Sequence, residues 1–445
     1  MIYLYQMQQR GNGENPHAKT SRLAVAELNG ENVDAQAEGL EKEEYELYQF
    51  YRDLGELVDQ VERNYAGKID RKELYDAAMQ GILDKLGPHC QFIPKKDAST
   101  FMEGVDSQFG GIGVVVQQKA DGIFAAGFVR QSPGQKAGVK EGDKLLAADG
   151  KSFERMGLTE VVKLLKGPAN SELKLSVLRR GEKKPTEIKV TRKVIPIESV
   201  LGVKRDKKGD WDFLFDAEKK IGYILVETFS KPTAADLKKA LIALEKQGVE
   251  RLILDLRSNP GGLLSSALEV ADMFVEKGTL LVNRGRNTRM QKHEATAPGT
   301  FKKFKLVVLI DNYSASGAEI VAAALQDLGR ATIVGKRSYG KGSIQDTVEL
   351  PNGNMFKITT AYFYRPNGKR IDRDLDAKTG EPTNENWGVS PKKANDVSLE
   401  WEEMKRFLRY REEAKIARQK SGSWATDPLL PDAQMERAIK VLTEK

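Results

Sequence analysis

The stretch Val307–Gln345 reads VVLIDNYSASGAEIVAAALQDLGRATIVGKRSYGKGSIQ, and it holds the change of pattern that decides the fold. The apolar, β-branched run Leu306–Ile310 has the length of a buried strand. The run stops at Asp311, and from Ile320 to Leu328 apolar residues recur at helical spacing. A strand that gives way to a helix within a few residues is typical of an α/β layer fold.

Two serines, Ser314 and Ser316, lie where this strand meets this helix. A hydroxyl at a strand-to-helix turn lies beside free backbone N–H groups, so it can attack a carbonyl while those groups hold the resulting oxyanion. Ser316 and Glu319 also have the S-x-x-E spacing of a capping box, so Ser316 alone could be a helix cap. The pattern therefore predicts either a nucleophile or a cap at this turn.

A serine nucleophile needs a base, and Lys341 is the best candidate. The three histidines lie in a polar N-terminal tail, beside Cys90 and in a charged loop (His17, His89 and His293). A lysine is a base only when it is neutral, so its pKa must fall by roughly three units from about 10.4, which burial can achieve. The flanking glycines allow a tight turn, and Gln345 could hold the amine in line. The alternative interpretation of Lys341 is a solvated surface residue.

The ordered set Ser316, Lys341 and Gln345 resembles the active-site region of the carboxyl-terminal processing peptidases, also called tail-specific proteases. The blocks SASGAEIVAAALQD and GKRSYGKGSIQ carry the resemblance, with 25 residues from Ser316 to Lys341 and four more to Gln345. The resemblance selects Ser316 over Ser314 and implies a Ser316–Lys341 dyad that Gln345 assists. Gly317 stands where the family usually has alanine, and its N–H would contribute to the oxyanion hole.

A second turn, from Arg257 to Gly262, reads RSNPGG and follows the predicted strand Leu252–Leu256. In isolation the turn could be no more than a strand exit. The resemblance implies that it supplies the second oxyanion donor, the Gly261 N–H, with Gly262 close behind.

Short predicted strands surround the motif Gly110-Gly111-Ile112-Gly113 and the sequence SPGQKAGVKEGD. They cover residues 114–116, 123–129, 144–148, 173–178 and 187–194, with a helix predicted over 159–165. Because a strand follows the glycines, they are not a dinucleotide fingerprint. The pattern resembles a PDZ domain, whose loop Gly110–Gly113 would bind a chain-terminal carboxylate while the peptide extends a sheet edge. Alternatively, these glycines only shape a hairpin.

Composition limits the other classes of function. The chain has 445 residues, 40% hydrophobic and 30% charged, and its net charge of +7 is spread along the sequence without a basic arm, so we expect no nucleic-acid partner. The single Cys90 excludes an intramolecular disulfide and disfavours a zinc site, and we expect no metal and no cofactor. No apolar stretch approaches 18 residues, so we expect no membrane span.

The pattern divides the chain into five regions. They are a flexible lead over 1–38, a helical N-terminal region over 39–105, a PDZ domain over 106–195, a Ser-Lys protease core over 196–395 and a helical C-terminal region over 396–445. The first region is polar and aperiodic. The resemblance implies a ClpP/crotonase-like α/β core with an inserted, mostly β PDZ domain.

The function implied is a serine endopeptidase that recognises the C-terminal tails of protein substrates and cuts near them. One alternative is a PDZ scaffold without catalysis. Another is a crotonase-like acyl-CoA enzyme or a penicillin-recognising enzyme, since Ser338 to Lys341 spells S-x-x-K, although Gly340 and Gly342 disfavour the helical turn that this motif needs.

The resemblance also implies that the protein acts outside the cytoplasm, in the periplasm or cell envelope. Met1–Gln9 is too short for a signal peptide, which suggests a trimmed or misassigned start. Apolar stripes on the terminal helices are explained by packing or by contact with a second copy in a homodimer.

Overall fold

The computed structural model describes residues 42–444 apart from 107, 130–131, 288, 376–378, 380 and 416–428. The flexible lead predicted for residues 1–38 lies outside the described residues. The chain forms two compact units, Met1–Phe92 and Ile93–Lys445, and each is described by itself.

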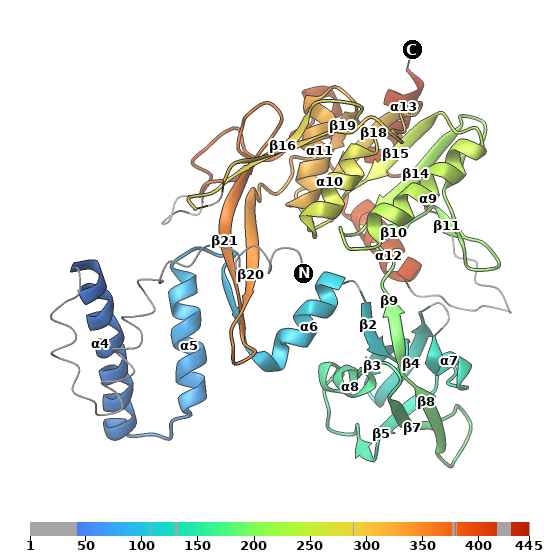
Figure 1. The fold of residues 1–445 in the computed structure, drawn as a ribbon. Helices are drawn as coiled ribbons and strands as arrows, with labels where there is room; N and C mark the ends of the chain where they lie inside the picture. Colours follow the sequence, from blue (N-terminus) through green and yellow to red (C-terminus); the bar gives the residue numbers. More distant parts are fainter. Residues whose placement is uncertain are drawn as a thin grey trace. The chain divides into compact units, whose positions relative to one another are not determined.

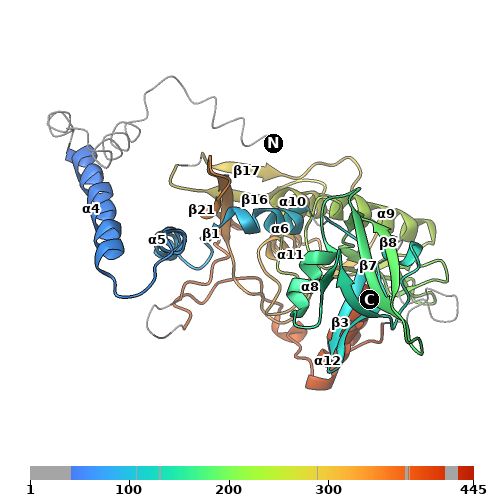
Figure 2. The ribbon, with the colours of Figure 1, turned by 90° about the horizontal axis from the view of Figure 1, so that it is seen from below.

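Two helices make up the described part of the first unit, as predicted. The helix α4 (Lys42–Asn64) carries the expected apolar stripe, and α5 (Arg71–Asp84) begins where Asp70 accepts a 2.8 Å hydrogen bond from the Lys72 N–H. This N-cap satisfies a donor that the first turn of a helix otherwise leaves free. Figure 2 shows α5 end-on and α4 along its length, so the two helices are inclined to each other.

The second unit is built on a central sheet that contains four parallel strands. Their bounds are β14 (Ile221–Val226), β15 (Arg251–Asp255), β18 (Lys305–Ile310) and β19 (Thr332–Gly335), adjacent in that order. The helices α9 (Thr233–Lys246), α10 (Leu264–Asp272) and α11 (Gly317–Asp327) follow β14, β15 and β18 (Figure 1). The short strands β10 (Val200–Leu201) and β13 (Leu214–Asp216) pair antiparallel with β14. The predicted α/β fold is confirmed.

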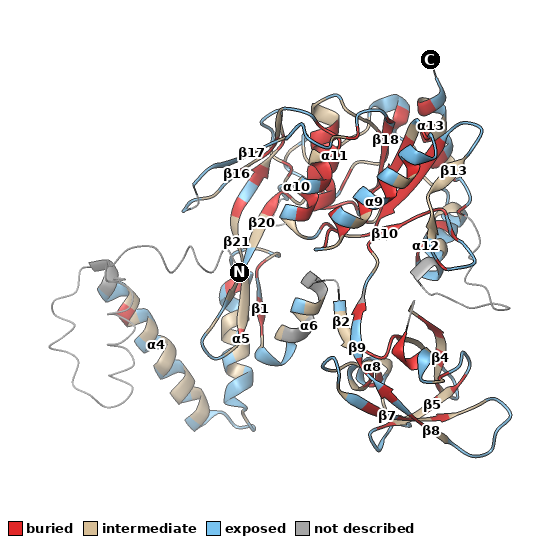
Figure 3. Cartoon of the chain, turned by 45° about the vertical axis from the view of Figure 1, so that its right-hand side comes forward, coloured by how far each residue is buried: buried red, intermediate tan, exposed pale blue. Residues whose placement is uncertain are grey.

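Helices cover both faces of this sheet, which explains why its strands are apolar throughout. Alternate residues such as Ile224, Leu254 and Val308 pack in one cluster with α9, α10 and α11. Their neighbours along the strands pack in a second cluster with Phe407 of α12 (Trp401–Lys415) and Met435 of α13 (Ala433–Thr443). Figure 3 shows α11 buried along most of its length. The predicted C-terminal helices are thus part of the core.

A mostly β domain precedes this core. Its sheet has the strand order β3-β4-β5-β7-β8, and β3 is therefore an edge strand. The bounds are β3 (Val114–Lys119), β4 (Gly122–Phe128), β5 (Lys144–Ala148), β6 (Lys151–Ser152), β7 (Glu172–Leu178) and β8 (Thr186–Thr191), with the helices α7 (Pro133–Lys136) and α8 (Leu158–Leu165). A separate pair joins β2 (Gln108–Gly111) to β9 (Lys193–Pro196).

The single strand predicted over 187–194 is wrong, because the structure divides it into β8 and β9 at Arg192. The buried Arg192 guanidinium donates to the carbonyls of Leu164 and Leu165, the last residues of α8. Cationic side chains commonly satisfy the free carbonyls at a helix C-terminus. The strand therefore breaks at the residue whose side chain caps the C-terminus of α8.

A second sheet contains β20 (Ser343–Glu349), β21 (Met355–Tyr364), β16 (Thr279–Arg284) and β17 (Gln291–Glu294), adjacent in that order. The remaining elements are β1 (Gln91–Ile93), α6 (Lys95–Asp106), β11 (Lys204–Arg205), β12 (Trp211–Asp212) and a 3₁₀ turn (Lys393–Asn395). The expected charged loop around His293 is wrong, since His293 lies on β17. In the described part of the chain, every helix is too short or too polar to cross a bilayer.

Candidate active site

Three chain segments meet where parallel strands of the central sheet end. One follows β15 and contains Gly261, one follows β18 and contains Ser316, and one follows β19 and contains Lys341. Because β15, β18 and β19 are parallel neighbours, their carboxyl ends share one edge of the sheet. Such edges are the usual position of ligand sites in open α/β sheets.

Ser316 occupies the N-cap of α11 in a rare backbone conformation. Its φ is 53° and its ψ is −113°, a combination that a residue with a side chain seldom adopts. Backbone strain of this kind costs about 1–3 kcal/mol and clusters at functional sites. A serine on a strained turn between a strand and a helix is also the arrangement of other nucleophilic serines.

The neighbouring Ser314 has a structural role. Its fully buried hydroxyl donates to the Leu256 carbonyl at 2.8 Å and accepts from the Asp311 N–H at 2.9 Å. Asp311 also accepts 2.8 Å hydrogen bonds from the N–H and the hydroxyl of Ser258. The turn after β18 is thus tied to the turn after β15, a link that the sequence pattern did not reveal.

The glycine turn lies directly against Ser316. Gly261 has a φ of +99°, and a Cβ on it would lie 2.7 Å from Ser316 Cβ and 2.8 Å from Gly317 N, so only glycine fits. The Gly261 N–H donates to Asn259 Oδ1 at 2.8 Å, whereas the N–H groups of Gly262 and Gly317 donate to no residue that the structure describes. Which glycine of this turn faces an oxyanion stays a prediction.

Glu319 joins the serine turn to the lysine segment. Its Oε2 accepts from the Ser316 N–H at 2.9 Å and from the Lys341 N–H at 2.8 Å, so these two backbone nitrogens are neighbours. Its Oε1 accepts from the Ser338 hydroxyl and the Gly340 N–H. The side chain is fully buried, and burial raises its pKa to about 7 despite these four donors. The capping-box spacing predicted only the bond to Ser316.

Lys341 is half-buried between two glycines that admit no side chain. A Cβ on Gly340 would lie 2.8 Å from Arg373 Cβ, and one on Gly342 would lie 2.5 Å from Asp372 Oδ2. Burial lowers the pKa of the Lys341 amine, the positive charge of Lys357 lowers it further, and Glu319 opposes both effects. All three influences act on the pKa of Lys341, which must be low if this lysine is to be a base.

The side chains of the predicted dyad are not joined. Within residues 42–444 as described, no hydrogen bond connects Ser316 Oγ with Lys341 Nζ. The Gln345 amide donates to Ser343 Oγ at 2.8 Å and to Thr359 Oγ1 at 3.5 Å, and it does not reach Lys341. Catalytic hydrogen bonds often form only when substrate binds, so this geometry leaves the assignment open to test.

The alternative S-x-x-K motif lacks its required structure. Residues 337–342 form no helix, so Ser338 and Lys341 do not share a helical turn. The buried Ser338 hydroxyl donates to Glu319 and accepts from the Val389 N–H at 2.7 Å. Ser338 therefore helps to hold the lysine segment.

The predicted carboxylate-binding glycines lie at the start of the β domain. Gly110 and Gly111 belong to β2, where a Cβ on Gly110 would collide with the Gly167 carbonyl. Ile112 is buried, and its carbonyl accepts 2.7 Å hydrogen bonds from Ser132 Oγ and Gly134 N. Gly113, with a φ of +66°, leads directly into the edge strand β3.

Comparison with known proteins identifies the family. The model of peptidase family S41 matches residues 220–378, and that of the PDZ domain matches residues 126–179. A carboxy-terminal-processing protease of Bartonella bacilliformis is 32% identical over 409 residues, which cover 90% of this chain and 89% of that protein. This chain belongs to the carboxy-terminal processing proteases. It is therefore a serine-type peptidase with a PDZ domain.

Other members of the carboxy-terminal processing proteases are similar over smaller shares. The protease CtpB of Bacillus subtilis is 33% identical over 73% of this chain, and the match spans 65% of CtpB. Among solved structures, the photosystem II D1 C-terminal processing protease is 25% identical, with a TM-score of 0.45 over 87% of this chain and 94% of that one. The family S41 match includes Gly261, Ser316, Lys341 and Gln345, whereas the PDZ match begins after Gly113.

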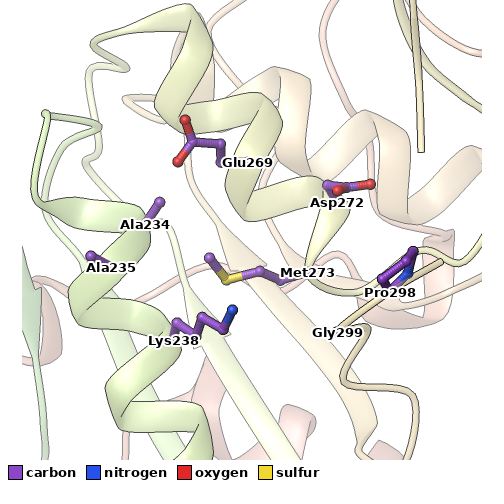
Figure 4. A pocket seen from close by; sticks show the side chains of 8 residues that line it. All are labelled: Ala234, Ala235, Lys238, Glu269, Asp272, Met273, Pro298 and Gly299. Carbon is purple, nitrogen blue, oxygen red and sulfur yellow. The ribbon is translucent and has the colours of Figure 1, made fainter. Parts of the chain in front are cut away.

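A pocket of this protease lies away from the predicted site. It has a volume of about 280 Å³ and lies between α9 and α10 (Figure 4). Its walls carry Lys238, Glu269 and Asp272, but Asp272 already accepts two 2.5 Å hydrogen bonds from Thr296. None of the predicted site residues lines this pocket. In the described chain, no cluster of three or more His, Cys, Asp or Glu residues is arranged to hold a metal ion.

Proposed function

We propose that this protease is an endopeptidase with a Ser316–Lys341 dyad, which cuts proteins near a C-terminal tail that its PDZ domain recognises. The observation that carries the proposal is the pair of hydrogen bonds that the N–H groups of Ser316 and Lys341 donate to one Glu319 oxygen. These bonds hold the two residues together, and Ser316 lies against the glycine turn, in a chain whose family is that of the carboxy-terminal processing proteases.

In the proposed reaction, the neutral Lys341 amine takes the proton of Ser316 Oγ as that oxygen attacks the scissile carbonyl. The oxyanion is held by the Gly317 N–H and by the Gly261–Gly262 turn. The resulting ammonium gives its proton to the leaving amine, which departs from an acyl-enzyme. The same amine then activates a water molecule that releases the acid product and restores Ser316. Gln345 would orient the amine after its side chain turns from Ser343.

The PDZ domain offers an edge for the tail. The strand β3 has one free edge in its sheet, and it packs beside α8. An extended peptide can add to such an edge and place alternate side chains in the groove beside it. We propose that Gly110, Gly111, Ile112 and Gly113 receive the terminal carboxylate at the start of this groove.

Cleavage of a protein with an apolar disordered tail tests the proposal. Ser316→Ala and Lys341→Ala should each abolish cleavage, and amidation of the tail should weaken it, because an amide lacks the terminal charge. Ser265→Ala, an exposed change on α10, is the matched control and should retain full activity. Mass spectrometry of the products locates the cut. Full cleavage by Ser316→Ala would overturn the assignment of Ser316 as the nucleophile. If the unmodified chain bound tails without cleaving them, the result would favour a binding scaffold.

We also propose that two copies associate through the terminal helices, among them α4. The resemblance further supports work in the periplasm or cell envelope, which fractionation of cells that produce the full-length protein would test. Activity confined to the cytoplasmic fraction would contradict it.

A further inference from the structure

Several polar residues near the predicted base Lys341 share one face of the two-stranded ribbon formed by β20 and β21. Gln345 lies opposite Thr359 and Thr347 lies opposite Lys357. The contact between Gln345 Nε2 and Thr359 Oγ1 places these two side chains on the same face, and the contact between Gln345 and Ser343 adds Ser343 to it. Side chains alternate along a strand, so Lys357, two residues from Thr359, shares this face.

The opposite face of the ribbon has different residues. There Thr360 donates to Asp346 at 2.7 Å. The strand β20 begins at Ser343, but the Phe363 N–H donates to the Gly342 carbonyl at 2.8 Å, so the pairing with β21 continues to Gly342. Lys341 comes next, two residues before Ser343, where the alternation gives it the same side. The ribbon therefore aims Lys357 and Lys341 to the same side.

The charge of Lys357 has no counterion among the residues that the structure describes. Many lysines of this chain form ion pairs, such as Lys336 with Asp396 and Lys166 with Glu103, but Lys357 makes none with a residue that the structure describes. Lys357 is also half-buried. A charge in such a position is screened less by water and salt than one on the open surface.

Other charged groups surround the lysine segment. From α11, Glu319 presents the opposite charge. From the segment after β21, Asp372 accepts from the Gly342 N–H and pairs with Arg370 at 3.2 Å, and Arg373 packs against Gly340 and lies 5.2 Å and 5.3 Å from the rings of Tyr339 and Trp387. Among these groups, Lys357 and Glu319 are the ones that act on the Lys341 charge, with opposite signs.

We propose that Lys357 is a positioning residue that acts on the predicted base Lys341 through the repulsion between their two positive charges. The proposal rests on the proposed role of Lys341 as the base. A second positive charge beside a lysine disfavours its ammonium form, which is one of the known ways to make a lysine nucleophilic or basic. The pKa of Lys341, lowered first by burial and then by Lys357, agrees with this role.

The test is the pH dependence of the rate at which a fluorophosphonate phosphonylates Ser316, with loss of fluoride, measured on the full chain with Lys357→Met and Lys357→Arg. Methionine keeps the length of the side chain without its charge. Lys357→Met should move the acid limb of the rate profile to higher pH, so that the rate at pH 7 falls about threefold or more while the plateau rate at high pH is unchanged. Lys357→Arg should follow the unmodified profile. The shift should shrink at 1 M salt.

Lys369→Met, which removes an exposed positive charge from the turn after β21, is the matched control and should leave the acid limb in place. An unshifted limb in Lys357→Met would overturn the inference, as would an equal shift in the control. A change in tail-substrate KM without a shift would instead mark Lys357 as a substrate contact. Failure of the proposed function itself is distinguishable, because Lys341→Ala would then still be phosphonylated by the fluorophosphonate with the pH profile of the unmodified chain.

Discussion

At the scale of single residues, the site depends on how one buried carboxylate distributes its four hydrogen bonds. Glu319 Oε2 accepts hydrogen bonds from Ser316 and Lys341, and Oε1 accepts them from Ser338 and Gly340. A buried carboxylate is costly, and hydrogen bonds from several donors reduce that cost. Glu319 thus fixes two backbone segments at once while its charge acts on Lys341.

Glu319→Gln separates the charge of this residue from its geometry. The amide oxygen can still accept from Ser316 and Lys341, but the NH₂ group would face the Gly340 N–H, and an unpaired buried donor costs about 1–3 kcal/mol. The negative charge that raises the pKa of Lys341 is lost. We therefore expect lower stability in urea and an acid limb of activity that moves to lower pH, the direction opposite to Lys357→Met.

Two further variants serve as controls for the expected effect of Glu319→Gln. Glu276→Gln removes a carboxylate from an exposed ion pair with Lys302 and should change neither stability nor the pH profile. Glu319→Ala removes both acceptor oxygens and should lower kcat by about a hundredfold, because small displacements of reacting groups have effects of this size. An acid limb that rises in Glu319→Gln would contradict the assigned electrostatics.

At the scale of elements, the sequence predicted the regular apolar segments well and the polar ones poorly. The strands β15 and β18 begin and end within one residue of the predicted bounds, because apolar runs buried on both faces mark them clearly. The polar sequence of β17, QKHE, predicts a loop, and only its pairing with β16 makes it a strand. The same limit applies to the site. The order of Ser316 and Lys341 is visible in the sequence. The hydrogen bonds that Ser338, Gly340 and Lys341 donate to Glu319 depend on the fold.

The helix α4 carries a prediction of its own about association. Phe50, Leu54, Leu57 and Val61 recur at spacings of four, three and four, which forms one apolar stripe. Phe50 and Leu57 are 50% and 59% exposed. A stripe with this spacing can pack against its own copy as in a coiled coil. We expect Phe50→Asp with Leu57→Asp to convert a dimer into a monomer in sedimentation velocity at micromolar concentrations.

The control is Arg52→Asp, on the polar side of α4. It changes the net charge by the same two units as the double variant but leaves the stripe intact. It should remain dimeric. A monomeric unmodified chain, or equal dissociation of the control, would rule out association through this stripe.

At the scale of the whole molecule, the C-terminal helices reach the glycine turn across a long stretch of sequence. Arg257, at the start of that turn, is fully buried and pairs with Asp255 at 2.6 Å and with Asp432 at 2.8 Å. Phe407 of α12 lies 4.0 Å from its guanidinium. Arg411, also of α12, pairs with Glu227 at 2.5 Å. The turn therefore contacts α12 and the N-cap of α13, which lie in the predicted C-terminal region.

Asp432→Asn tests whether the position of the turn depends on these contacts, without removing the cap of α13. Asparagine is as good an N-cap as aspartate, so the bond to the Met435 N–H should persist. The buried Arg257 would lose one of its two carboxylate partners, which should cost about 1.5–3 kcal/mol in urea unfolding. We expect kcat to fall about tenfold as the turn shifts, with an unchanged KM for the tail and an unchanged pH profile, because neither the PDZ groove nor Lys341 is altered. Asp396→Asn, which breaks a more exposed pair with Lys336, should leave both stability and kcat close to their original values. If Asp432→Asn lost stability but kept its full kcat, the C-terminal helices would support the fold without positioning the turn.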